Sequence, residues 1–125
     1  MTATSGIVMV VDDDLAVRES LKFALEIEGL EVAACGSGAE LLAHPELPHV
    51  GCLVLDYRMP AMDGLEVMER LACRKMRPPV ILITSHATTA LCQRAAAAGV
   101  RYVLEKPLLG NALVNGIRDV LNQPD

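Results

Sequence analysis

Aromatic residues are nearly absent from this sequence. Its 125 residues include no Trp, one Phe and two Tyr, although 52% of them are hydrophobic. The core must therefore consist of aliphatic side chains and methionine, and little aromatic surface is left to stack on nucleic-acid bases. The net charge of −5 also repels a phosphate backbone, so we expect no direct binding of DNA or RNA by this chain.

The sequence also lacks cysteine motifs for metal binding or redox chemistry. Cys35, Cys52, Cys73 and Cys92 lie far apart, and no two of them form a C-x-x-C pair. Zinc sites and dithiol redox sites usually need such closely spaced pairs. We therefore expect reduced thiols that are buried or inert.

Long hydrophobic runs and targeting segments are missing as well. The apolar stretch Ile7–Val11 has no basic segment before it and meets three aspartates directly after it. It is too short for a signal peptide, and no other stretch approaches the length of a membrane span. We expect a cytoplasmic protein that does not contact a membrane.

Short apolar runs alternate with helical patterns along the chain. The runs predict buried strands at Ile7–Val11 and at residues 30–34, 52–55, 80–83 and 102–104. Helices are predicted after Asp14, at residues 37–44, after Asp63, at Thr89–Ala98 and at residues 113–121. Five strands alternating with five helices predict an α/β fold, a doubly wound parallel sheet in the flavodoxin-like order 2-1-3-4-5.

Polar residues directly follow four of these predicted strands. In open α/β sheets, ligands bind beyond the carboxyl ends of the strands. The sequence places there Asp12, Asp13 and Asp14 after the first strand, Asp56 after the third, Thr84 after the fourth, and Glu105 and Lys106 after the fifth. Because the first and third strands are neighbours in the predicted order, we expect their carboxylates to converge.

Converging carboxylates need a positive charge beside them. Two like charges about 4 Å apart repel by roughly 4 kcal/mol at an effective dielectric constant of 20. A hard divalent cation would offset this repulsion, so Mg²⁺ is the expected ion, with Mn²⁺ as the alternative. Lys106 adds a fixed positive charge. An aspartate after a strand is also a common helix N-cap, and Asp14 fits that role better than a ligand role.

The sequence resembles the receiver domains of two-component response regulators, which have the CheY-like fold. Four motifs carry the resemblance, each at a predicted strand end: IVMVVDDD (7–14), LVLDYRMPAMDG (53–64), ILITSHA (81–87) and LEKP (104–107). Residues 1–125 would then form one receiver domain. The runs at 58–60 and 84–87 are most similar to receivers of the FixJ type, which commonly precede a helix-turn-helix DNA-binding domain, so a transcriptional role is implied by analogy.

The resemblance implies roles for the residues at the strand ends. Asp56 would accept a phosphoryl group from a sensor histidine kinase or a phosphotransfer protein and form an aspartyl phosphate. Asp13, Asp56 and the main-chain carbonyl of Arg58 would hold Mg²⁺, and Asp12 would act through a water molecule. Thr84 and Lys106 would contact the phosphoryl group, with a cis peptide bond between Lys106 and Pro107.

Other positions would control the lifetime and the transmission of the signal. Arg58 and His86 lie two residues beyond Asp56 and Thr84, at sites that flank the phosphoryl group in the family. Val103 stands where many receivers have a switching aromatic residue, and Tyr102 points to the opposite face of the strand. The change would then pass through the loop after Thr84 and the next helix. The family's output surface, the fourth helix with the fifth strand and helix, would support a homodimer.

Three alternative functions remain to be weighed against a phosphoacceptor signalling domain that is not an enzyme. A scaffold that is never phosphorylated usually lacks the acidic pair, the acceptor or the lysine, all of which are present. A Mg²⁺-dependent phosphatase with an aspartate nucleophile usually has a second aspartate where Arg58 stands. A flavin carrier needs a phosphate-cradling loop in place of Asp12, Asp13 and Asp14.

Overall fold

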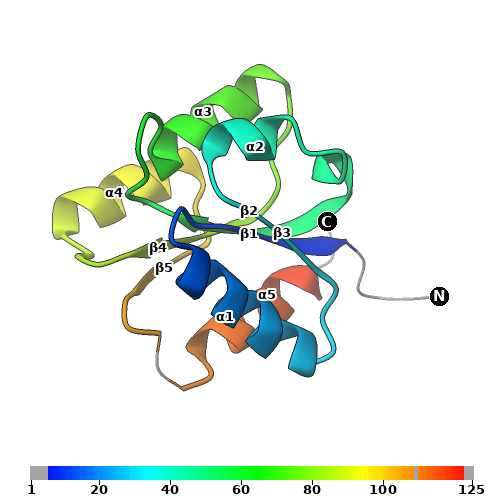
Figure 1. The fold of residues 1–125 in the computed structure, drawn as a ribbon. Coiled ribbons are helices and arrows are strands. Elements are labelled where there is room, and N and C mark those ends of the chain that lie inside the picture. Colours follow the sequence, from blue (N-terminus) through cyan, green and yellow to red (C-terminus); the bar gives the residue numbers. More distant parts are fainter. Residues whose placement is uncertain (1–5, 109, 123–125) are drawn as a thin grey trace.

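One parallel sheet lies between two layers of helices in the computed structural model, which describes residues 6–108 and 110–122 (Figure 1). Its strands are β1 (Ile7–Val11), β2 (Val32–Cys35), β3 (Val50–Asp56), β4 (Val80–Thr84) and β5 (Tyr102–Glu105). The sheet order is β2-β1-β3-β4-β5, and every neighbouring pair is parallel. The predicted α/β fold and strand order are therefore confirmed.

Helices cover both faces of this sheet. Figure 1 shows α1 (Leu15–Ile27) and α5 (Ala112–Leu121) on one face, with α2 (Gly38–Leu42), α3 (Gly64–Cys73) and α4 (Thr89–Ala98) on the other. A short 3₁₀ turn, η1 (Leu47–His49), leads into β3. Within the described part of the chain, no helix is long and apolar enough to cross a membrane.

Each face of the sheet has its own aliphatic core. Alternate residues of β1, such as Met9 and Val11, pack beneath α2, α3 and α4, whereas Val8 and Val10 pack beneath α1 and α5. All five residues of β1 are buried. Burial of each such side chain stabilises the fold by about 1.5–3 kcal/mol. Because both faces are covered, the strands have no polar alternation, which explains the uninterrupted apolar runs in the sequence.

Side-chain caps start the helices that follow the strand ends. The Asp14 Oδ1 atom accepts a hydrogen bond from the Val17 amide at 3.2 Å, which confirms Asp14 as an N-cap. Asp63 and Glu66 form a reciprocal capping box at the start of α3, with N–O distances of 2.9 and 2.8 Å. These caps fix where the loops after β1 and β3 end.

The start of the second strand needs correction, whereas the cysteines are free as expected. Strand β2 begins at Val32 rather than at residue 30, because the Leu30 amide donates to the Leu25 carbonyl and so closes α1. The cysteines are free, and burial raises the pKa of Cys35 to about 11 and that of Cys52 to about 12, which makes both thiols inert. Cys73 is exposed and Cys92 is partly exposed, so burial applies only to Cys35 and Cys52.

Gly64 allows α3 to approach the end of β3, and we expect Gly64→Ala to destabilise the protein. An added Cβ would lie 2.9 Å from Leu82 Cδ1 and 3.1 Å from the Asp56 carbonyl oxygen. Overpacking of this kind costs about 1–3 kcal/mol in the free energy of unfolding, which urea denaturation measures.

Gly116→Ala in α5 is the matched control for this substitution. Its added Cβ would have its nearest contact at 3.4 Å, with Ile81 Cδ1, an ordinary contact distance. Alanine is also the better helix former by up to about 1 kcal/mol, so the control should be neutral or stabilising. A Gly64→Ala variant as stable as wild type would contradict the close approach.

Candidate functional site

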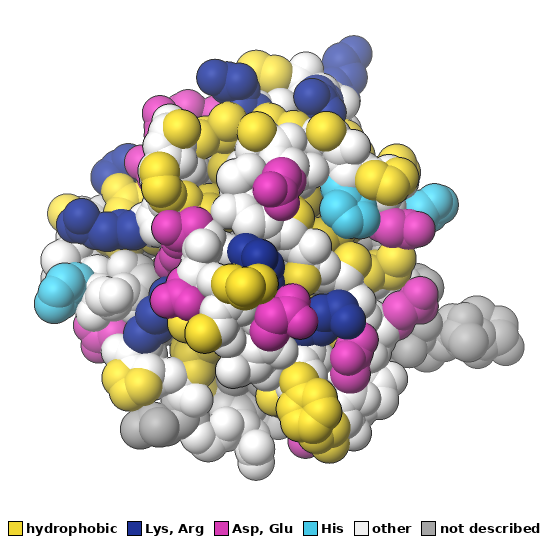
Figure 2. Space-filling model, in the orientation of Figure 1, with side chains coloured by type: hydrophobic (Ala, Val, Ile, Leu, Met, Phe, Trp, Pro, Cys, Tyr) yellow, Lys and Arg dark blue, Asp and Glu magenta, His cyan; other side chains and the backbone are white. Residues whose placement is uncertain are grey.

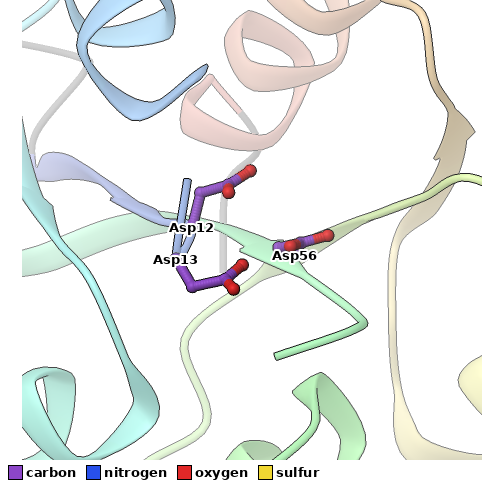
Figure 3. Close-up of side chains that lie close together, drawn as sticks. All are labelled: Asp12, Asp13 and Asp56. Carbon is purple, nitrogen blue, oxygen red and sulfur yellow. The ribbon is translucent and has the colours of Figure 1, made fainter. Parts of the chain in front are cut away.

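Three aspartates from two neighbouring strands gather at the carboxyl edge of the sheet (Figure 3). Asp12 and Asp13 follow β1, and Asp56 is the last residue of β3. One carboxylate oxygen from each of them lies within 4.8 Å of the others. Strands β1 and β3 are adjacent and parallel, with Val11 opposite Leu55, so the register itself brings these residues together.

The three aspartates differ in their exposure. Asp12 and Asp56 are buried, with 2% and 6% of their surfaces exposed, whereas Asp13 is exposed to solvent. The cluster is therefore buried at Asp12 and Asp56 and open to solvent at Asp13. A ligand can approach it from solvent without unfolding any element.

Both the side chain and the main chain of Asp12 form hydrogen bonds. Its Oδ1 atom accepts from the Asp14 amide at 2.9 Å, and its carbonyl oxygen accepts from Arg18 Nη1 at 2.8 Å. Its own amide donates to the Cys35 carbonyl of β2 at 3.3 Å. The Asp12 carboxylate therefore has one oxygen already engaged by the backbone of the following turn.

Lys106, the residue after β5, supplies positive charge to this cluster. Its Nζ atom lies 3.5 Å from Asp12 Oδ2 and 3.5 Å from Asp56 Oδ1. Partial burial would lower the pKa of Lys106, but the charges of Asp56 and Asp12 raise it above its ordinary value. The lysine therefore stays protonated at neutral pH. The peptide bond between Lys106 and Pro107 is cis.

One lysine does not neutralise the carboxylates. Burial, followed by the charge of Asp12, raises the pKa of Asp56 to about 6, against a lowering effect from Lys106. The side chains of the site thus leave negative charge uncompensated. Its donors are hard carboxylate oxygens on two strand ends, and this set fits a divalent cation such as Mg²⁺.

Thr84, the last residue of β4, lies buried beside the loop that leads to α4. Its hydroxyl donates to the His86 carbonyl at 3.3 Å and accepts from the His86 amide at 3.2 Å. The side chains of His86 and Arg58 are exposed.

The two β5 residues Val103 and Tyr102 contact different sides of the sheet. Val103 is partly buried and packs against the core beneath α4. Tyr102 is 38% exposed, and its hydroxyl donates to Asp119 on α5.

Three contacts near the site involve residues to which sequence reasoning gave no role. The Ala87 amide donates to Glu105 Oε2 at 3.1 Å, and Arg94 Nη1 donates to the Tyr57 hydroxyl at 3.2 Å. The third is the contact of Arg18 with Asp12. The sequence signals were weak, because each side chain has a partner that is distant in the sequence or that is a main-chain group.

A flavodoxin-like sheet with an acidic cluster and a lysine at its carboxyl edge defines a CheY-like signalling domain. The chain belongs to the response regulator receiver domain family, whose sequence model matches residues 8–118. Receiver domains bind Mg²⁺ at an acidic aspartate cluster and interact with histidine kinases or phosphotransfer proteins. The phosphatase, scaffold and flavin-carrier alternatives are not favoured by this membership.

Curated relatives agree with the family. The chain is 40% identical over 116 residues to the transcriptional regulatory protein FixJ of Azorhizobium caulinodans, covering 93% of this chain and 55% of that protein. It is 36% identical over 115 residues to nodulation protein W of Bradyrhizobium diazoefficiens, covering 92% and 51% respectively. The chain thus spans about half the length of these curated relatives.

Solved structures show the same fold. The crystal structure of FixJ-N superposes with a TM-score of 0.85 at 32% identity, covering 100% of this chain and 98% of that one. The response regulator StyR gives a TM-score of 0.85 at 38% identity, covering 94% and 59%. These likenesses confirm the resemblance to receivers of the FixJ type.

Asp56→Asn should stabilise the metal-free protein at neutral pH. The folded-state pKa of Asp56 is about 6, above its ordinary value of 3.8, so the folded state favours the protonated form. The stabilisation that the raised pKa gives to the folded state is therefore fully present below about pH 4 and is lost as the pH rises through about 6. Removing the charge should raise the free energy of unfolding by roughly 1–2 kcal/mol at pH 7.5, after allowance for solvent screening.

Urea denaturation in EDTA at pH 7.5 and pH 4 tests this expectation, since the gain should shrink at the lower pH. Glu19→Gln on the exposed surface of α1 is the control for simple loss of a carboxylate charge. If Asp56→Asn were less stable than wild type at pH 7.5, the ionised Asp56 carboxylate would not be destabilising, and the expectation would be wrong.

Proposed function

We propose that Asp56 is the phosphoacceptor of this receiver domain and that residues 1–125 act as one such domain. The observation that carries the proposal is the position of the Asp56 carboxylate, beside Asp12 and Asp13 and 3.5 Å from Lys106 (Figure 3). Positive charge beside a carboxylate nucleophile stabilises the charge on the phosphoryl group during its transfer. The donor would be a phosphohistidine of a sensor kinase or a phosphotransfer protein.

The chemistry is an in-line phosphoryl transfer. An Asp56 oxygen would attack phosphorus as the bond from phosphorus to the histidine nitrogen breaks, and the imidazole would leave with that electron pair. Lys106 would pair with the oxygens of the incoming phosphoryl group. Its raised pKa keeps it charged for that purpose. Asp56 itself is mostly ionised at pH 7.5, since its pKa is about 6.

Asp13, Asp56 and the main-chain carbonyl of Arg58 would hold the Mg²⁺ ion, or Mn²⁺ in its place. When bound, the ion neutralises negative charge on the carboxylates and the phosphoryl oxygens. Asp12 would contact the ion through a water molecule. The hydrogen bond from the Asp14 amide to Asp12 Oδ1 supports this, because it already engages one Asp12 oxygen.

The chain would act as a switch rather than as a turnover enzyme, assisting only its own phosphorylation and dephosphorylation. Arg58 occupies the position where aspartate-nucleophile phosphatases usually have an acidic group. Arg58 and His86 are both exposed beside the site, where they would shield or position the water that hydrolyses the aspartyl phosphate. Their side chains would therefore set the lifetime of the signal.

The output would follow that of the FixJ-like relatives, whose names describe transcriptional regulators. In that setting this cytoplasmic domain would control a separate DNA-binding part through a homodimer on α4, β5 and α5. Acidic and basic side chains are interspersed on the face shown in Figure 2, and the net charge is −5. Both features support our view that this chain does not itself bind nucleic acid.

We propose further that the signal leaves the site through the loop after Thr84 and through α4. The Thr84 hydroxyl now bonds to His86, and it would turn to a phosphoryl oxygen on Asp56. Two further contacts tie this region to the site: Ala87 with Glu105, and Arg94 of α4 with Tyr57 next to the acceptor. Val103 has few rotamers available, which favours this route over a side-chain relay in β5.

Incubation with acetyl phosphate and Mg²⁺, followed by intact-mass measurement, tests the acceptor. Wild type should gain one phosphoryl group, and Asp56→Ala should gain none. EDTA should abolish labelling of the wild type, because the ion is required. Thr84→Val should still label, since its hydroxyl is not the nucleophile. Unlabelled wild type would contradict the proposed function and favour the scaffold.

Backbone amide NMR with and without beryllofluoride, a phosphoryl mimic, tests the route. Signals from residues 85–94 should shift in wild type, and the shifts in this segment should be largely lost in Thr84→Val. Residues 22–27, in the half of α1 that is remote from Asp12 and Asp13, serve as the internal control. If residues 85–94 kept their positions in wild type while the mimic bound, the route would be wrong.

A further inference from the structure

Arg18 connects the start of α1 to the end of β1. Its main-chain amide donates to the Asp14 carbonyl at 2.9 Å, as the first turn of the helix requires. Its side chain turns back, and Nη1 donates to the Asp12 carbonyl at 2.8 Å. One residue thus binds both ends of the short turn that contains Asp13.

The Asp12 carbonyl belongs to the peptide group that links Asp12 to Asp13. Because a peptide group is planar, its orientation fixes ψ of Asp12 and φ of Asp13 together. It therefore also sets the direction in which the Asp13 side chain leaves the backbone. Asp13 is exposed, so side-chain packing does not hold it as it holds Asp12 and Asp56. The hydrogen bond from Arg18 is a specific restraint on its position.

The loop after β2 leaves room for this guanidinium. A Cβ at Gly36 would lie 2.8 Å from Arg18 Nη1 and 3.5 Å from its Cζ. Gly36 is not among the glycines with positive φ, so its backbone does not itself require glycine. Its amide is held by Glu40 Oε1 at 2.7 Å. The missing side chain at this position is therefore best explained by the space that Arg18 needs.

We propose that Arg18 is a positioning residue of the metal site, which holds the Asp12–Asp13 peptide so that Asp13 faces the ion. The inference rests on the proposed function, in which Asp13 is a ligand of Mg²⁺. Partners that orient a ligand commonly change metal affinity by 10- to 100-fold when they are removed. Arg18 would act in this way through the main chain and would not touch the ion or the phosphoryl group.

The direction of the effect separates positioning from charge. Removing a positive charge near the carboxylates makes the site more negative, which by itself would strengthen the binding of a cation. Loss of the contact that positions Asp13 would instead weaken the binding of the cation. A weaker affinity in Arg18→Ala is therefore the opposite of what simple loss of charge produces.

Mg²⁺ binding to the full chain, measured by isothermal titration calorimetry, tests the proposal directly. Arg18→Ala should bind Mg²⁺ about ten-fold more weakly than wild type. Gly36→Ala should also bind more weakly, because the added methyl displaces the end of the flexible Arg18 side chain while keeping its charge. Lys22→Ala, which loses the same charge from the same helix and only an exposed ion pair with Glu26, should stay within about two-fold of wild type.

Labelling with acetyl phosphate gives a second readout. The Mg²⁺ concentration for half-maximal labelling should rise in Arg18→Ala and Gly36→Ala, whereas the rate at saturating Mg²⁺ should remain close to that of wild type. Mg²⁺ affinity in Arg18→Ala equal to or stronger than that of wild type would overturn the proposal. So would a lower maximal rate with unchanged Mg²⁺ dependence.

Folding of each variant is checked by urea denaturation. If Arg18→Ala does not fold, Gly36→Ala decides, and wild-type Mg²⁺ affinity in that variant would overturn the proposal. Failure of the proposed function is distinguishable, because it would appear as unlabelled wild type. The calorimetric comparison among the four proteins would still judge the role of Arg18 in that case.

Discussion

Repulsion among the carboxylates of Asp12, Asp13 and Asp56 is the constraint on which the rest of the site depends. Burial, followed by the charge of Asp12, raises the pKa of Asp56 to about 6, although Lys106 lies 3.5 Å away and lowers it. The packed sheet prevents separation, because β1 and β3 are paired in register and covered by helices on both faces. The aliphatic core thus holds together a cluster that its own electrostatics oppose. Binding of a cation would relieve part of this repulsion.

The fold and the position of the site follow from the sequence because both depend on local patterns. Each apolar run became a strand, and residues directly after the runs, such as Asp12, Asp56 and Thr84, reached the same edge through the strand order. Strand boundaries were less certain: Leu30 looked like the start of β2 but closes α1 through a main-chain hydrogen bond. Hydrophobicity alone does not distinguish these two uses of a leucine.

The contacts of Arg18, Tyr57 and Glu105 could not be predicted in the same way. Each joins a side chain to a partner that is distant in the sequence or in the main chain, such as Arg94 for Tyr57 and the Ala87 amide for Glu105. Charged residues at such positions are usually solvated, and only the three-dimensional arrangement shows which of them has a partner. These contacts join α1, α4 and the loop after β4 to residues at or next to the strand ends, so the positions of the site residues were easier to predict than the contacts around them.

The two sides of the cluster are restrained differently, and this bears on how a phosphoryl group would be accommodated. On the side of β1, Asp12 is bound through its carboxylate, its carbonyl and its amide, to Asp14, Arg18 and Cys35. On the side of β4, the Thr84 carbonyl accepts from the Lys106 amide at 2.8 Å, but the Thr84 hydroxyl bonds only to the main chain of His86, in an exposed loop within the described residues. A phosphoryl group on Asp56 would therefore lie between the hydrogen-bonded Asp12 on one side and the loop after Thr84 on the other. This difference in hydrogen bonding supports the proposed route toward α4, which does not depend on an aromatic side chain at Val103.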